Sequence, residues 1–446
     1  HDIQKKVIFA GGPLTFFPSL REAFFRILQL DPQKDLATSE HPEIMAAEGA
    51  ALCHDNDGYV AEIEKCIQII DNGRMRRSKE DETRLPPLFS NQQEIKSWEE
   101  RHSRDYVKKV EVSELEGVPC FLGIDSGSPT TKLVLIDDQR RVALNWYDSN
   151  SGDTIGTVRK GLAVLKDSCL NAGVVPEIVR TAVTGYGEDL IKVAFSIDDG
   201  VVETVAHYRA ARHFLPEVTF ILDIGGQDMK AIYVLDGGIS DIQINEACSS
   251  GCGTFIETLA ESLNLKVADF ARIACEAAAP FNLGTRCTVF MNSRVKQALR
   301  EGATVADISA GLACSVIGNT LYKVLKLNDP SQLGEHIVVQ GGTFRNPAVL
   351  RAFELEIGRE VVRPDISEVM GAYGAALTAL QNHIAEPTAL TTFPGLNHDS
   401  QEKIVSTREF HCGGCENNCK VTGITFSGGR SYFTGNRCER HFSNRG

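Results

Sequence analysis

Two stretches of the chain share a pattern in which a strand-like run ends in an aspartate and a glycine-containing turn leads into another strand-like run. They read GIDSGSPTTK at residues 123–132 and DIGGQD at residues 223–228. Such turns expose backbone N–H groups and hydroxyls to phosphate, and the carboxylate can hold a hydrated magnesium ion. Two of these hairpins predict a two-lobed nucleotide clamp, in which each lobe grips the phosphates from its own side.

A third glycine pair near residue 341 is expected to close over the adenosine. Ordinary glycine turns are the alternative for any one loop, and a structural salt bridge is the alternative for Lys132. No GxxxxGK[ST] loop occurs, and the pattern does not match a GxGxxG dinucleotide site. We predict ATP or ADP with Mg²⁺, the catalytic residues Asp125, Asp223 and Gln227, and the binding residues Gly127, Ser128, Thr130, Lys132, Gly225, Gly226, Asp228, Gly341, Gly342 and Asn346.

Strand-like and helix-like runs alternate from residue 120 onward, which indicates a mixed α/β fold with two similar halves. We expect strands at 121–124, 132–136, 142–146, 219–224 and 230–235. The expected helices are 155–172, 187–193, 254–264, 267–278, 293–301, 305–326 and 347–358.

Composition limits the class of protein. The chain has 446 residues, of which 42% are hydrophobic, enough for two or three domains. Its formal net charge of −13 argues against general nucleic-acid binding, which needs a basic surface. The sequence contains no long apolar run and does not open like an export signal, so we expect a cytoplasmic protein without a membrane partner.

An internal echo suggests a repeated module. Residues 7–14 (VIFAGGPL) resemble 337–344 (IVVQGGTF), and 41–52 resemble 363–377. We expect residues 1–75 to be the later part of a first module and the chain to be part of a longer polypeptide. Residues 76–118 are expected to form a charged, solvated linker with one helix, 119–385 a complete module, and 386–446 a cysteine-rich tail.

Cys248, in NEACSSGCGTF, and Cys287, in CTVF, lie in small-residue settings where helices are expected to begin. A helix start favours an anionic thiolate, the ligand that iron needs. The pair therefore suggests an iron-sulfur cluster, and two buried thiols are the alternative. Cys252, four residues after Cys248, would lie on the same helix face as either a spare ligand or a packing residue.

The remaining cysteines fall into two groups. The CxxCx₃C spacing in the tail, with a further cysteine downstream, predicts a metal centre whose metal, iron-sulfur or zinc, the spacing does not decide. The neighbouring His411 and His441 are expected to face solvent. The predicted tail ligands are Cys412, Cys415, Cys419 and Cys438, and the expected packing residues are Cys53, Cys66, Cys120, Cys169, Cys275 and Cys314.

The motifs GIDSGSPTTK, VTGYGEDL, ILDIGGQDMK, NEACSSGCGTF, CTVF and GGTFRN follow one another in the chain. Together they resemble the ATP-dependent activator family of 2-hydroxyacyl-CoA dehydratases and benzoyl-CoA reductases, which belongs to the actin, Hsp70 and sugar-kinase superfold with its ribonuclease H-like lobes. In a longer subtype of that family the module occurs twice in one chain. Pro129 departs from the threonine usual in the family and removes a hydroxyl and a backbone donor.

The resemblance implies a function and its partners. Cys248 and Cys287 would supply two of the cysteine ligands of one [4Fe-4S] cluster, which would be shared across a homodimer or between two modules of one chain. The protein would use ATP hydrolysis to deliver single electrons from a ferredoxin or flavodoxin to a dehydratase- or reductase-type iron-sulfur enzyme. The alternatives are a metabolite kinase of the same superfold and a nucleotide-gated scaffold with structural zinc.

Overall fold

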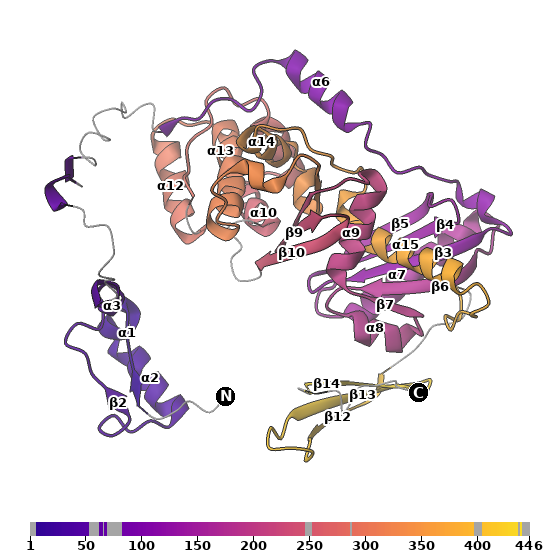
Figure 1. Cartoon of the computed structure of the whole chain (residues 1–446), viewed down its shortest axis with the longest axis horizontal. Helices are drawn as coiled ribbons and strands as arrows, with labels where there is room; N and C mark the ends of the chain where they lie inside the picture. Colours follow the sequence, from indigo (N-terminus) through magenta and orange to yellow (C-terminus); the bar gives the residue numbers. More distant parts are fainter. Residues whose placement is uncertain are drawn as a thin grey trace. The chain divides into compact units, whose positions relative to one another are not determined.

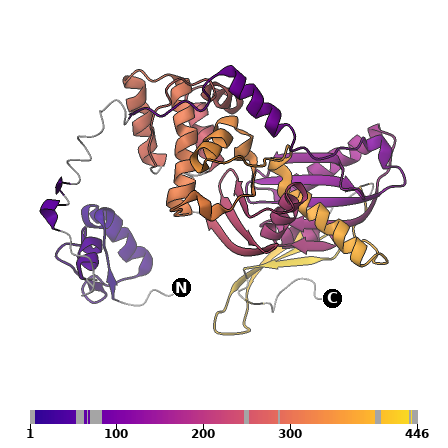
Figure 2. The same ribbon diagram turned by 45° about the horizontal axis from the view of Figure 1, so that its top comes forward.

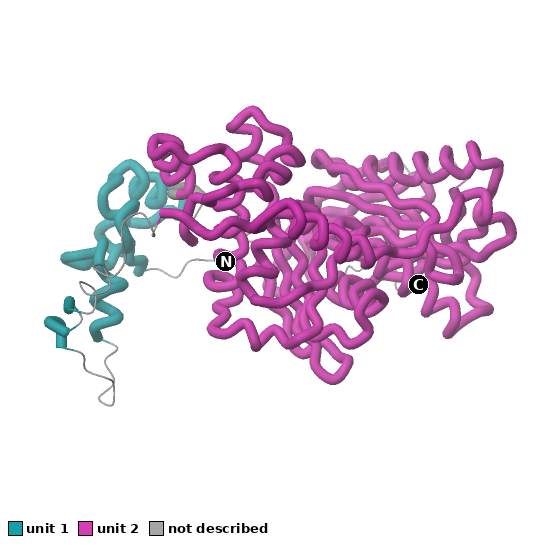
Figure 3. The backbone as a smooth tube through the Cα atoms, turned by 90° about the horizontal axis from the view of Figure 1, so that it is seen from above, with its two compact units in different colours: residues 1–78 teal, residues 79–446 magenta. Residues whose placement is uncertain are grey.

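The computed structural model describes residues 6–52, 62–65, 67–68, 83–245, 252–285, 288–396, 404–435 and 438. The chain divides into two compact units, His1–Ser78 and Lys79–Gly446 (Figure 3). None of the helices within the described ranges combines the length and the apolar character that crossing a bilayer requires.

The first lobe of the larger unit is a mixed sheet covered by helices on both faces (Figure 1). Its strands are β3 (Pro119–Ser126), β4 (Thr130–Asp137), β5 (Val142–Ser149), β6 (Glu177–Thr184) and β7 (Asp199–Val201), in the order β5–β4–β3–β6–β7. Strands β3, β4 and β5 are antiparallel neighbours, whereas β6 runs parallel to β3 and β7. Helices α7 (Thr154–Asn171) and α8 (Glu188–Phe195) cover one face, and α9 (Glu203–Phe214) and α15 (Met370–Ala385) cover the other.

The second lobe repeats this plan. Strands β8 (Phe220–Ile224), β9 (Met229–Leu235), β10 (Gly238–Asn245) and β11 (Ile337–Gln340) pair in the order β10–β9–β8–β11, with only β11 parallel to its neighbour among them. One face is covered by α10 (Gly253–Ser262), α11 (Val267–Ala274), α12 (Thr288–Arg300), α13 (Val305–Gly318) with a π-helical extension (Asn319–Val324), and α14 (Pro347–Ile357). The predicted strands and helices are therefore confirmed, with shifts at their ends, while β6, β7, β10, β11, α9 and α15 were not predicted.

Side-chain alternation decides what each face of a strand meets. In β3, Leu122 and Ile124 pack with α7 and α8, whereas Phe121 packs with α9 and α15. Gly123 shares the face of Phe121, and a Cβ there would lie 2.0 Å from the carbonyl oxygen of Ala372. Glycine is therefore needed for α15 to lie this close to the sheet.

The predicted linker contains the expected helix, α6 (Gln92–His102), but the expectation that it is solvated is wrong. Trp98 and His102 are buried against α14, where Glu354 accepts hydrogen bonds from Trp98 Nε1 at 2.6 Å and Arg101 Nη2 at 2.6 Å. His102 Nε2 lies 3.1 Å from the same carboxylate. Burial alone would raise the pKa of Glu354, but these hydrogen bonds outweigh it and hold the pKa at about 2.

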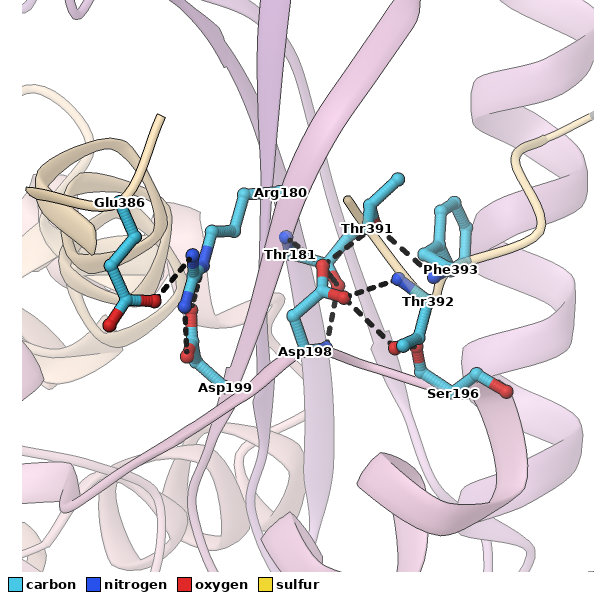
Figure 4. A network of polar contacts seen from close by, with 9 residues as sticks. All are labelled: Arg180, Thr181, Ser196, Asp198, Asp199, Glu386, Thr391, Thr392 and Phe393. Carbon is cyan, nitrogen blue, oxygen red and sulfur yellow. Dashed lines mark hydrogen bonds and ion pairs between the residues drawn. The ribbon is translucent and has the colours of Figure 1, made fainter. Parts of the chain in front are cut away.

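The segment after α15 is tied to the first lobe by Asp198 and Arg180 (Figure 4). Asp198 accepts hydrogen bonds from the backbone and hydroxyl of Thr181, from the Thr391 hydroxyl at 2.8 Å and from the Thr392 backbone at 2.6 Å. Arg180 pairs with Asp199 at 2.8 Å and contacts Glu386, the residue after α15, at 3.5 Å. These contacts hold the segment that connects α15 to the tail against β6 and the start of β7.

The tail is an antiparallel sheet of β12 (Ile404–His411), β13 (Lys420–Phe426) and β14 (Ser431–Thr434), drawn in yellow in Figure 2. Phe426 is buried in the first-lobe core together with Phe393. Arg430 donates from Nη2 to the carbonyl of Ala194, the penultimate residue of α8, at 3.2 Å. The tail sheet is therefore anchored to α8.

The smaller unit has an element order similar to that of residues 337–385 in the larger one. It contains β1 (Val7–Ile8), α1 (Gly12–Phe16), α2 (Pro18–Leu28), β2 (Leu36–Ala37) and α3 (Met45–Leu52), with β1 parallel to β2. Gly11 has φ 88° and ψ 159°, and Gly341, its counterpart in the sequence echo, has φ 90° and ψ 157°. No residue of α1, α2 or α3, which all lie in a described range, is buried, whereas α14 buries Leu350 and Phe353.

Removing the Glu354 carboxylate is expected to release α6. In Glu354→Ala, Trp98, Arg101 and His102 lose their shared acceptor at a buried site, which costs about 3 kcal/mol for a broken buried pair. We expect a lower urea midpoint and faster amide hydrogen exchange along α6. Glu356→Ala, which removes an exposed carboxylate of α14 that accepts from the Tyr322 hydroxyl and does not contact α6, is the matched control and should leave hydrogen exchange of α6 unchanged. Unaltered exchange of α6 in Glu354→Ala would contradict this role.

The same carboxylate should give stability a defined pH dependence. Folding lowers the pKa of Glu354 from 4.5 to about 2, so between these values the folded chain binds fewer protons than the unfolded chain. The stabilisation is present in full above about pH 4.5 and is lost as the pH falls through 2. Glu354→Gln should flatten the stability profile in this window, and a slope equal to that of the wild type would count against the prediction.

Candidate nucleotide cleft

A cleft of about 1300 Å³ is lined by residues of both lobes of the larger unit. The three glycine loops predicted from the sequence all contribute to its wall. The predicted site residues found there are Asp125, Gly127, Ser128, Thr130, Lys132, Asp223, Gly225, Gly226, Gln227, Asp228, Gly341, Gly342 and Asn346. The fold therefore gathers the whole predicted nucleotide site into one cavity.

Strand alternation explains why an acid from each lobe lies at the floor of this cleft. Asp125 shares the face of Phe121 and Gly123 on β3, the face that meets α15 and α9. Asp223 shares the face of Ile221 on β8, which also packs against α9. Because both hairpins follow the same plan, the two carboxylates both lie on the sheet face that is turned toward α9.

In the first lobe, the buried Asp125 is neutralised by an ion pair with Lys132. Its Oδ2 accepts from Lys132 Nζ at 2.9 Å, so Lys132 forms the ion pair that was the alternative to phosphate binding. Burial alone would lower the pKa of Lys132, but the charges of Asp125 and Asp223 outweigh it and raise the pKa. Asp125 Oδ1 is buried and accepts no hydrogen bond from any described residue. That unused oxygen fits a hydrated magnesium ion.

The second lobe holds its acid in a wider network that sequence patterns did not reveal. Asp223 Oδ2 lies 3.3 Å from His207 Nε2, and burial raises the pKa of Asp223 although His207 and Lys230 oppose it. Lys230 contacts Glu203 at 3.0 Å and pairs with Asp228. Burial alone would lower the pKa of Lys230, but the charges of Asp223 and Glu203 raise it.

Backbone contacts join the second and third loops to the start of α10. Gly253 N donates to the Gly225 carbonyl at 3.0 Å, and Thr254 N donates to the Gly226 carbonyl at 3.0 Å. Thr343, in the third loop, donates its hydroxyl to the same Gly225 carbonyl at 2.9 Å. A shift of the second loop would therefore move the first turn of α10.

The first loop is shaped by Asn150, a buried residue that sequence reasoning missed. Its Nδ2 donates to the carbonyl oxygens of Gly127 at 2.7 Å and Ser128 at 3.1 Å, and its Oδ1 accepts from the Thr131 hydroxyl at 2.6 Å. Its backbone N–H donates to the Pro129 carbonyl at 2.8 Å. The loop thus stays closed although Pro129 offers no N–H of its own.

The third loop and the tail complete the wall. Asn346 caps α14, because its Oδ1 accepts from the backbone of Ala348 at 2.9 Å and of Val349 at 3.3 Å. Ile256, Val267, Ala268 and Ala271 give the cleft an apolar part that can receive a base. Tyr432 of β14 also lines the cleft, so the tail takes part in a site that its sequence did not indicate.

The predicted cluster ligands Cys248 and Cys287 lie outside the described residues. Helix α12 begins at Thr288, the residue after Cys287. Cys252 is extended and buried in the second-lobe core, and α10 begins only at Gly253. Cys252 therefore lies before α10 and not within a helix as expected, and its packing in the core is confirmed.

The tail cysteines lie toward one end of the tail sheet. Cys412 follows β12, Cys415 and Cys419 lie in the connection to β13, and Cys412 N donates to the Cys419 carbonyl at 2.8 Å. Cys438 follows β14, and His411 is exposed as expected, whereas His441 lies outside the described residues. Among the described residues, no group of three or more His, Cys, Asp or Glu side chains is close enough to hold a metal ion.

Four of the six cysteines expected to be packing residues are confirmed as such. Cys120 and Cys169 are buried, and Cys275 and Cys314 pack against the second-lobe core. Burial raises the pKa of Cys120, Cys275 and Cys314 to about 12, which keeps these thiols protonated. Cys53 and Cys66 lie outside the described residues.

The paired lobes and the cleft between their hairpins define an ATPase of the actin, Hsp70 and sugar-kinase superfold, as predicted. Residues 122–379 match the BadF/BadG/BcrA/BcrD ATPase family, and the chain belongs to this family. The predicted family is thereby confirmed. The smaller unit, α6 and the tail lie outside the matched residues.

Two characterised relatives match the same module. The chain is 30% identical over 258 residues to the (R)-2-hydroxyglutaryl-CoA dehydratase activating ATPase of Acidaminococcus fermentans, covering 58% of this chain and 96% of that protein. It is 31% identical over 260 residues to the 2-hydroxyisocaproyl-CoA dehydratase activator of Clostridioides difficile, covering 58% and 94%. The solved structure of the activator from Clostridium difficile with bound ADPNP matches with a TM-score of 0.53 and 29% identity, over 60% of this chain and 97% of that one.

Neighbouring glycines in the third loop should respond differently to alanine. At Gly341, with φ +90°, a Cβ would lie 2.3 Å from the Ile224 carbonyl oxygen, whereas nothing lies within 4 Å of a Cβ on Gly342. We expect Gly341→Ala to lower the free energy of unfolding by about 1–3 kcal/mol, because the strain has no relief. Gly342→Ala should leave the urea midpoint unchanged. Equal midpoints for the two variants would contradict the constraint at Gly341.

Proposed function

We propose that this ATPase is a reductive activator, in which the nucleotide cleft controls a [4Fe-4S] cluster that donates single electrons to a partner enzyme. The path of the chain is the observation that carries the proposal. Helix α10 begins in the cleft, where Gly253 and Thr254 bond to the second glycine loop, and Cys248 lies shortly before this helix. Helix α12, in the same lobe, begins immediately after Cys287. A change at the phosphates would therefore reach the start of α10, which Cys248 shortly precedes in the sequence.

Each loop has a role in this proposal. Gly127, Ser128 and Thr130 of the first loop and Gly225, Gly226 and Asp228 of the second hold the phosphates with Mg²⁺. Asp125 and Asp223 organise the magnesium ion and water, and Gln227 orients the attacking water. Gly341, Gly342 and Asn346 hold the adenosine beside the apolar part of the cleft. Lys132 acts on the phosphates only through Asp125, with which it is paired.

Cys248 and Cys287 are proposed as the ligands from one side of a shared cluster, completed by a second copy of the chain or by a second module. When bound, the cluster would supply one electron at a time. The relatives named above activate 2-hydroxyacyl-CoA dehydratases. We propose a dehydratase- or reductase-type iron-sulfur enzyme as the acceptor for this chain, and a ferredoxin or flavodoxin as the donor.

The regions outside the matched module are assigned in the same way. Residues 1–75 are proposed to be the later part of a first module, supported by the element order and the glycine geometry shared with residues 337–385. Residues 76–118 join the two modules. Residues 386–446 are proposed to form a tail in which Cys412, Cys415, Cys419 and Cys438 take up iron-sulfur or zinc after rearrangement of the thiols.

Metal analysis after anaerobic purification tests the proposal. We expect iron and acid-labile sulfide in the wild type, and ATP-dependent electron transfer from a strong reductant to a candidate acceptor. Cys287→Ala should lose the iron of the shared cluster and electron transfer but keep ATP binding. Cys275→Ala, which alters a protonated packing thiol, is the matched control and should keep both. Zinc without iron, or full iron in Cys287→Ala, would contradict the proposal.

A further inference from the structure

His207 lies at the floor of the cleft, and the roles assigned above leave it unused. It is 5% exposed and belongs to α9. Its Nε2 lies 3.3 Å from Asp223 Oδ2 and 3.7 Å from Glu203 Oε1, and its Nδ1 lies 2.8 Å from Gln340 Nε2. Nδ1 is therefore hydrogen-bonded to Gln340 of β11, whereas Nε2 lies within ion-pair distance of Asp223 of β8 and of Glu203 but has no hydrogen-bond partner among the described residues.

Helix α9 belongs to both lobes at once. Ala206 and Ala210 pack into the first-lobe core with Phe121. Ala211 packs with Ile221 and Val338 of the second-lobe sheet. His207 therefore lies on the helix between the two lobes, where a change in the angle between the lobes would alter its distances to the neighbouring side chains.

A glycine on α15 keeps space open between His207 and the first-lobe acid. A Cβ on Gly371 would lie 2.6 Å from Asp125 Oδ2 and 3.2 Å from His207 Nε2. The two groups therefore meet over the same point of the α15 backbone. The imidazole contacts Asp223 on one side and shares this space with Asp125, so carboxylates from the two lobes are brought together around one ring.

We propose that His207 is a positioning residue for ATP hydrolysis, which holds the Asp223 carboxylate of the second lobe in register with Asp125 of the first. The hydrogen bond to Gln340 fixes the orientation of the ring and turns Nε2 toward Asp223. Gly371 gives the ring and Asp125 the room to approach each other. The proposal rests on the assignment of this cleft as the nucleotide site. Its physical basis is that a carboxylate displaced by about 1 Å at a reacting centre can cost roughly 10²-fold in rate.

Steady-state ATPase kinetics with ADP binding, measured on the full chain, tests this role. We expect His207→Ala to lower kcat by about 100-fold while KM and the Kd for ADP stay within about threefold, because alignment is lost and binding is not. His207→Gln should recover part of kcat, since its amide can donate to Asp223. Gly371→Ala should also lower kcat, because its Cβ would displace Asp125 and the ring of His207, although residue 207 itself is not substituted.

His213→Ala is the matched control, because His213 lies on the same helix but packs against Tyr373 and Phe214. It should keep the wild-type kcat. An unchanged kcat in His207→Ala would overturn the proposal. Equal losses of kcat and ADP binding in His207→Ala, His207→Gln and His213→Ala would overturn it as well, because they would mark a purely structural role. Failure of the wild type to bind ADP would instead remove the nucleotide-site assignment, and this proposal with it.

Discussion

Paired charges buried where two lobes meet are the interaction on which this structure depends. Asp125 and Asp223 are 2% and 8% exposed, and an isolated carboxylate with so little water would be costly. Lys132 serves the first acid, and His207 and Lys230 serve the second. These partners come from β4, α9 and β9, so the charge balance fixes how hairpins and helices meet. The first and second glycine loops follow β3 and β8, which carry the two acids, and line the same cleft.

Local patterns were sufficient to predict the loops and most of the strands beside them. A strand with alternating faces followed by an acid and glycines is written within about ten residues, as at 123–132 and 223–228. Helix α15 escaped prediction because it is buried on nearly every side, so its small residues show no amphipathic period. The burial of α6 could not be predicted locally. Trp98, Arg101 and His102 share the acceptor Glu354, which lies more than 250 residues away in the sequence.

The same distance in sequence hid part of the candidate site. Gln340 reaches His207 across 133 residues, and no neighbouring pattern marks either of them. Asn150 shapes the first loop from the end of a different strand. Tyr432 enters the cleft only because the tail sheet is anchored to α8. The residues of a loop that could bind a ligand can be predicted from local sequence. The side chains that orient this loop come from parts of the chain that are distant in sequence and close only in the fold.

We propose that nucleotide phosphates and a divalent cation lie between the first and second glycine loops. A crystal structure with ADPNP and Mn²⁺ in place of Mg²⁺ tests it most directly. We predict phosphate density between residues 127–130 and 225–228, with an anomalous manganese peak beside Asp125 and Asp223. A nucleotide bound elsewhere, or a manganese peak remote from both carboxylates, would contradict the account.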